Sequence, residues 1–146
     1  MFRPLARSIV RAALFGLVAV PMFACSNTPV VPTNPILNPS TDTFTGTLSV
    51  NGAFTHIFTI NTLGSVTVTI VNLAPDASQL VGLSLGVWNG TACSTSPATG
   101  GAASDIATTG TSITLNATSA GNLCSRLYDV GFITTPVLYT MQITHP

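Results

Sequence analysis

The sequence has few charged residues, which make up 5% of its 146 residues, and it contains neither lysine nor glutamate. Three of its four basic side chains, Arg3, Arg7 and Arg11, lie close to the N-terminus. Beyond residue 25, Arg126 is the single cation against four aspartates, a formal net charge of −3. Nucleic-acid binding needs clustered Lys or Arg side chains that displace counterions from phosphates. The composition therefore excludes nucleic acid as a partner.

The sequence also lacks a recognisable catalytic constellation. A serine triad would need its nucleophile on a strained turn, beside a histidine and a carboxylate, whereas the Gly-x-Ser-x-Gly match at residues 82–86 lies within an alternating run that is expected to form a strand. Glycoside hydrolysis needs two carboxylates, but Asp76 and Asp129 lie in turn-forming sequence, where a structural role is expected. His56 shares the parity of the apolar residues around it, which favours a core-edge histidine over a catalytic base. We predict that the protein is not an enzyme, and a small secreted hydrolase is the least favoured alternative.

The N-terminal residues have the pattern of an export signal. A basic segment precedes the apolar run from Ala12 to Val20, which is short for a bilayer span, and small Ala24 precedes Cys25. We predict a helical signal peptide over residues 1–24 and a mature protein outside the cytoplasm.

The stretch Met22-Phe23-Ala24-Cys25 resembles the lipobox of bacterial lipoproteins. That resemblance implies that Cys25 becomes the N-terminal residue and carries lipid, palmitate included, which anchors the chain to a membrane. Phe23 departs from the pattern, because the family prefers a small or branched residue there. The alternative is an ordinary signal cut after Ala24, which would leave a free thiol on a secreted protein.

Residues 25–40 are rich in Pro, Asn, Ser and Thr, a composition typical of an extended, solvated linker. Such a linker would hold a domain a short distance from the membrane, on the periplasmic or outer face of the cell envelope. The remaining residues, 41–146, suffice for one domain with a core of its own.

Alternation of apolar and polar residues with period 2 runs through this domain, and it predicts β-strands. The expected strands cover residues 43–50, 54–60, 65–71, 81–87, 112–117, 123–130 and 137–143. Asn51-Gly52 and Leu63-Gly64 are expected turns, so that the first three strands form an up-and-down meander. Residues 72–78 are expected to form a loop, and residues 89–110 a long loop with one short strand. Seven or eight short antiparallel strands predict a two-sheet, jelly-roll-like β-sandwich in an all-β domain.

Two features of this pattern indicate tight local packing. Gly82 and Gly86 alternate with apolar residues, which predicts that something packs closely on that face of the strand. Cys93 and Cys124 are the cysteines left once Cys25 is assigned to lipid, and in an exported protein they indicate a disulfide. No histidine accompanies them and no calcium-loop spacing is present, so we expect neither a metal nor a cofactor.

Residues 124–131 and 137–143 resemble the end of bacterial pre-peptidase C-terminal (PPC-type) domains, where a final Tyr-Thr-hydrophobic strand follows a turn. The Val-Thr-Val-Thr run at 66–69 and the aliphatic run at 80–87 are similar too, so the resemblance covers most of residues 42–144. The chain departs from the family where Gly121-Asn122-Leu123-Cys124 replaces a Gly-x-Tyr-Tyr approach. The resemblance implies a jelly-roll-like β-sandwich that serves as an accessory or binding module, and it implies no catalytic residue.

Three side chains are the candidate ligand contacts: Trp88, Tyr128 and Arg126. The aromatic residues could stack on a sugar, whereas the structural alternative is that Trp88 caps the edge of the core and that Arg126 pairs with Asp129 or another aspartate. We predict a non-enzymatic envelope lipoprotein, a binding or accessory module for a carbohydrate or an envelope protein. A self-associating surface subunit is the second hypothesis, because strands with so few charges lack the usual protection against edge-to-edge pairing.

Overall fold

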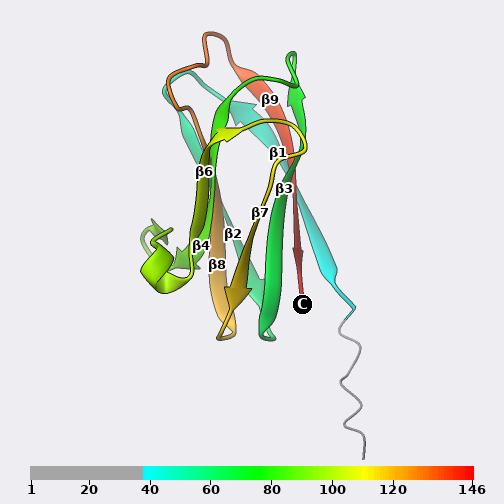
Figure 1. Ribbon diagram of the computed structural model, residues 1–146, viewed down its shortest axis with the longest axis vertical. Helices are drawn as coiled ribbons and strands as arrows, with labels where there is room; N and C mark the ends of the chain where they lie inside the picture. The colour runs from blue at the N-terminus through cyan, green and yellow to red at the C-terminus, as the bar shows by residue number, and fades with distance from the viewer. Residues whose placement is uncertain (1–37) are drawn as a thin grey trace, which may run out of the picture. The chain divides into compact units, whose positions relative to one another are not determined.

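The protein is described from a computed structural model, which places residues 38–146. These residues form two antiparallel sheets that pack as a β-sandwich, as the sequence predicts (Figure 1). The first sheet has the order β1-β9-β3-β7 and comprises β1 (Ser40–Leu48), β9 (Val137–His145), β3 (Gly64–Ala74) and β7 (Ser112–Ala117). The second has the order β2-β8-β4-β5, with β2 (Ala53–Ile60), β8 (Gly121–Tyr128), β4 (Val81–Trp88) and β5 (Cys93–Ser94). A further strand, β6 (Ala102–Ala107), also pairs with β4, and one short 3₁₀ helix, η1 (Pro97–Thr99), precedes it.

The core lies between the two sheets and consists of the alternate residues that each strand turns inward. Because side chains of a strand point to opposite faces in turn, the apolar set of each strand reaches one common interior. The fully buried side chains include Leu48, Ile60, Ile70, Leu73, Leu83, Leu85, Leu127, Met141 and Ile143. The threonines between the inward residues of the first sheet lie on its outer face.

The predicted meander of the first three strands is wrong. β1 pairs with β9, β2 with β8, and β3 with both β9 and β7, so consecutive strands belong to different sheets. The turn at Asn51 and Gly52 does form, with φ of 55° at Asn51 and a 2.9 Å hydrogen bond from the Gly52 N–H to the Ser49 carbonyl. It carries the chain from one sheet across to the other. Alternation reports which face of a strand is buried, and it does not report which strand lies alongside.

Two regions contain more strand than the expected pattern. β3 continues to Ala74 through an irregularity between Ile70 and Asn72, so part of the expected loop at residues 72–78 is strand. Residues 89–110 contain two strands rather than one, because β5 pairs with the end of β4 in addition to β6, the short strand expected around Ile106. In β6 only Ala107 is buried, and the large apolar residue Ile106 is exposed, which explains the weak apolar pattern of this strand.

The expected close packing on β4 and the disulfide are both confirmed. A Cβ atom at Gly82 would lie 2.1 Å from the ring of Tyr128, and one at Gly86 would lie 2.0 Å from the carbonyl oxygen of Ser94. The Tyr128 ring and the chain around Ser94 therefore lie directly against the backbone of β4. The disulfide between Cys93 and Cys124 joins this covering segment to β8.

The signal peptide, the lipid at Cys25 and most of the linker fall on residues 1–37, outside the described residues. Among residues 38–146, no helix is long and apolar enough to span a bilayer.

Candidate functional site

A pocket of about 320 Å³ lies on the outer face of the second sheet, where β2, β8 and the end of β4 meet. We call it the Arg126 pocket. Its lining residues are Ala53, Thr55, Trp88, Thr91, Ala92, Cys93 and Arg126. Two of the three predicted ligand contacts, Trp88 and Arg126, therefore line one hollow, although 38 positions separate them in the chain.

Strand register explains why these residues meet. Thr55 of β2 lies opposite Arg126 of β8, and Arg126 lies opposite Ser84 of β4, so all three point outward from neighbouring strands. Trp88, four residues after Ser84, shares its outward parity at the end of β4 and pairs with Cys93. The disulfide to Cys124, on the same face of β8 as Arg126, holds that edge of the pocket in place.

Tyr128, the third predicted contact, places its ring against the guanidinium group of Arg126. The guanidinium carbon of Arg126 lies 5.5 Å from the centre of the Tyr128 ring, a distance at which a cation is attracted to an aromatic face. The Tyr128 hydroxyl donates a hydrogen bond to Asp105 of β6. Burial, followed by that hydrogen bond and the charge of Asp105, raises the pKa of Tyr128 to about 12. Tyr128 is thus a neutral, anchored platform beneath the arginine at physiological pH.

The ion pair with an aspartate, which is the structural alternative for Arg126, is not formed within residues 38–146. Asp129 instead accepts hydrogen bonds from the backbone N–H groups of Asn51, Gly131, Phe132 and Ile133. Asp76 accepts from Ser78 within its own turn, Asp42 lies 3.2 Å from His145, and Asp105 accepts from Tyr128. Each aspartate has another partner, and the turn-forming roles predicted for Asp76 and Asp129 are confirmed. Among residues 38–146, the side chain of Arg126 has no hydrogen-bonding or ion-pair partner.

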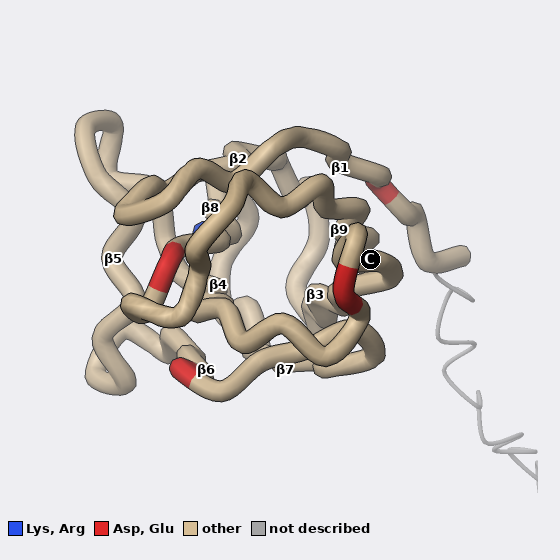
Figure 2. Tube along the Cα trace, turned by 90° about the horizontal axis from the view of Figure 1, so that it is seen from above, with Lys and Arg blue, Asp and Glu red and all other residues tan. Residues whose placement is uncertain are grey.

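This distribution of charge is visible across residues 38–146. Figure 2 shows the acidic residues of this part at separate places around the sandwich and its one basic residue on β8. A cation without a carboxylate beside it is free to bind an anion from solution, because no internal partner has to be displaced first.

A second polar cluster lies inside the sandwich, at the side where β1 and β2 are neighbours. The Nε2 atom of His56 and the hydroxyl oxygen of Tyr139 are 2.8 Å apart, and the ring of Phe44 lies 4.6 Å from the His56 ring. Burial lowers the pKa of His56 below its ordinary value of 6.5. The partner of His56 is a phenol, and neither a carboxylate nor a serine contacts its ring nitrogens among the described residues. This geometry agrees with the predicted core-edge histidine.

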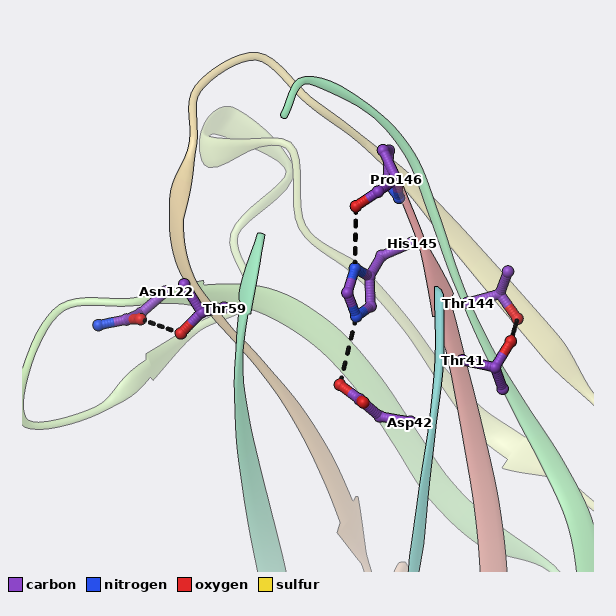
Figure 3. A network of polar contacts seen from close by, with 7 residues as sticks. All are labelled: Thr41, Asp42, Thr59, Asn122, Thr144, His145 and Pro146. Carbon is purple, nitrogen blue, oxygen red and sulfur yellow. Dashed lines mark hydrogen bonds and ion pairs between the residues drawn. The ribbon is translucent and has the colours of Figure 1, made fainter. Parts of the chain in front are cut away.

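His145 forms a comparable contact at the end of β9. Its Nε2 lies 3.2 Å from Asp42, and its Nδ1 lies 3.2 Å from the backbone oxygen of Pro146 (Figure 3). Its ring also stacks on Phe58. The last strand expected from the sequence ends at residue 143, two residues before this histidine. Both of its nitrogens have partners within the chain, and no serine or cysteine side chain is among them. Within residues 38–146, no group of three or more His, Cys, Asp or Glu side chains could hold a metal ion.

No protein-family model matches the chain, and no curated protein matches it either. The resemblance to PPC-type domains stays a prediction that depends on the quoted residues.

Sequence reasoning missed part of the Arg126 pocket. Thr55 lies in an expected strand, but its position beside Arg126 depends on the pairing of β2 with β8. Asp105 was not connected to Tyr128, because the weak pattern of the short strand in residues 89–110 does not indicate that this strand pairs with β4. A larger hollow of about 530 Å³ lies at the turns around Leu63 and Ser119, but no charged or aromatic side chain lines it. The Arg126 pocket is therefore the stronger candidate.

Proposed function

We propose that this chain is a non-enzymatic lipoprotein of the bacterial cell envelope, anchored through Cys25, whose β-sandwich binds a ligand in the Arg126 pocket. The observation that carries the proposal is the position of the single cation of residues 38–146. It lies beside an indole, over a phenol and without an acidic partner.

The rigidity of the pocket supports a binding role. Trp88 and Arg126 extend from paired strands, and the disulfide holds the segment that contributes Thr91 and Cys93. A site that is already ordered loses less conformational entropy when it binds than a flexible loop does. Its volume lies at the small end of the range of about 300–1,000 Å³ that is usual for small-molecule sites.

Anchoring and binding can be tested separately. Intact mass of the protein extracted from membranes should correspond to a chain that begins at Cys25 and carries acyl groups, with two protons gained on reduction of the disulfide. An unmodified chain would contradict the anchoring. Because Trp88 is the only tryptophan, its fluorescence should change on titration with a ligand. The same change in Arg126→Gln would contradict the proposed site.

Self-association is a second candidate function, favoured by the strands at one side of the sandwich. β1 and β2 are each paired along one edge only among the described residues, and β2 carries no Lys, Pro or acidic residue to protect its free edge. Ile57 and Phe54 of β2 are 47% and 44% exposed. Light scattering at high concentration should then show assemblies that Ile57→Lys dissolves, and a strict monomer would rule out this function.

A further inference from the structure

We infer that the ligand of the Arg126 pocket is an acidic saccharide, whose carboxylate pairs with Arg126 and whose sugar ring packs against Trp88. The inference rests on the proposed binding function and specifies the chemistry of that same site.

The arginine selects for an anion with a planar pair of oxygens. A guanidinium presents five N–H donors in a rigid fork that matches a carboxylate through two parallel hydrogen bonds. The Tyr128 ring beneath the guanidinium helps to hold that fork in place, and no described residue uses its donors. A ligand carboxylate would therefore gain charge-assisted hydrogen bonds without breaking existing ones.

The charge around the pocket favours a singly charged group over a doubly charged phosphate. Residues 38–146 carry one positive and four negative side chains, and Asp105 lies directly behind Tyr128. A doubly charged phosphate could neutralise one charge on Arg126, while its second charge would be repelled by the acidic domain. A carboxylate has one charge and is matched by one arginine.

The other lining residues favour a sugar as the bearer of that carboxylate. Trp88 supplies a large apolar face, and the hydroxyl groups of Thr55 and Thr91 supply hydrogen-bonding partners with no charge. A pyranose ring has apolar C–H groups on one face and hydroxyls around its rim, so it matches both kinds of wall. The pocket is open on the outer face of the sheet, so a saccharide chain can continue beyond it.

The test is a titration of the purified full-length protein, in detergent, with an oligomer of galacturonic acid. Its methyl ester is the matched ligand, because it keeps every ring and removes every carboxylate charge. Glucuronic acid oligomers, a neutral glucose oligomer, tetra-aspartate and inorganic phosphate complete the set. Trp88 fluorescence reports on the pocket directly, and calorimetry gives a second reading that does not depend on tryptophan.

We expect saturable binding of at least one uronic acid oligomer, with affinity reduced about tenfold or more for its methyl ester. Arg126→Gln should cause a similar loss, Arg126→Lys a smaller one because Lys keeps the charge without the fork, and Trp88→Phe a loss seen by calorimetry. Thr114→Ala, on the outer face of the opposite sheet, is the control variant and should bind like the parent protein. Arg126 is exposed, and an unchanged melting temperature would verify that its variants fold.

Three results would overturn the inference, and they differ in what they say of the proposed function. Equal binding of acid and ester would make the ligand a neutral sugar and would leave the binding function in place. Preference for tetra-aspartate or phosphate would assign the pocket to an acidic peptide or to a phosphorylated ligand, again with binding retained. Absence of any response at Trp88 to every ligand in the set would contradict the acidic saccharide. The binding function itself would then be judged on whether a membrane-extracted saccharide fraction produces a response that depends on Arg126.

Discussion

The outer faces of the two sheets differ although both follow from the same alternating pattern. On the first sheet the strand register aligns Thr41, Thr144, Thr67 and Thr114 in one row across four strands. Neighbours in such rows share hydroxyl hydrogen bonds, for example Thr41 with Thr144 at 3.2 Å and Thr67 with Thr114 at 2.9 Å (Figure 3 for the first pair). No strand of that sheet places a charged side chain on this face.

The second sheet is covered on part of its outer face. Gly82 and Gly86 of β4 leave room for the Tyr128 ring and for the chain around Ser94, so β4 is buried on both faces. The aromatic, cationic and disulfide groups of the domain gather around that cover. The residue type at the outward positions therefore decides whether a sheet face stays exposed to solvent or is covered by a second layer with a pocket.

Removing the disulfide, which holds the covering segment of the second sheet, should have the largest effect on the free energy of unfolding. Replacing both cysteines in Cys93→Ser/Cys124→Ser should lower the free energy of unfolding by about 3–4 kcal/mol, as estimated from the loop that the bridge closes. Urea unfolding would measure this loss, and Trp88 fluorescence would report the opened pocket. A loss below about 1 kcal/mol would mean that the covering segment is held by its other contacts.

The glycines of β4 should give the next largest effect. Gly86→Ala would place a Cβ against the backbone of Ser94. The disulfide at the neighbouring Cys93 keeps that backbone from moving away, so we expect the free energy of unfolding to fall by about 1–3 kcal/mol. Ser112→Ala, on the exposed face of the first sheet, is the matched control. Equal stability of the two variants by urea unfolding would argue against tight packing of the cover.

Acidification should lower the free energy of unfolding through His56, which lies in the interior that both sheets share, and not through groups on the outer faces. Because burial lowers the pKa of His56 in the folded protein, the unfolded chain binds a proton more readily between that lowered value and 6.5. The free energy of unfolding should therefore fall as the pH drops below about 6.5. Urea midpoints measured from pH 8 to pH 5 should show this fall, and His56→Gln should reduce it. A pH profile unchanged by that substitution would contradict the role of His56.

The smallest effects on the free energy of unfolding are expected for the threonines on the outer face of the first sheet. Thr67→Val and Thr114→Val should each change the free energy of unfolding by less than about 0.5 kcal/mol, since both side chains are in contact with solvent. The double variant would give the coupling of their shared hydrogen bond, which we expect at about 0.2–1 kcal/mol. A loss as large as that of Gly86→Ala would mean that the bare face contributes as much to folding as the covered one.

Several parts of this molecule could be predicted from local sequence. The inward-facing residues of β9, from Val137 to Ile143, follow from alternation. The close packing over Gly82 and Gly86 follows from the absence of a side chain at those two positions. The disulfide follows from the number of cysteines. The position of Asp105 under the pocket could not be predicted, because β6 has a weak apolar pattern and is held by backbone pairing with β4.

The local pattern of residues specifies which side of each strand is buried, because the period of two is a property of a single strand and needs no partner. Which strands lie side by side follows from the folded chain alone. Backbone hydrogen bonds are nearly the same for every residue type, so the local pattern of β1 does not distinguish β9 from β2 as a neighbour. The Arg126 pocket depends on that choice: Thr55, Arg126 and Ser84 meet across three strands because β8 lies between β2 and β4.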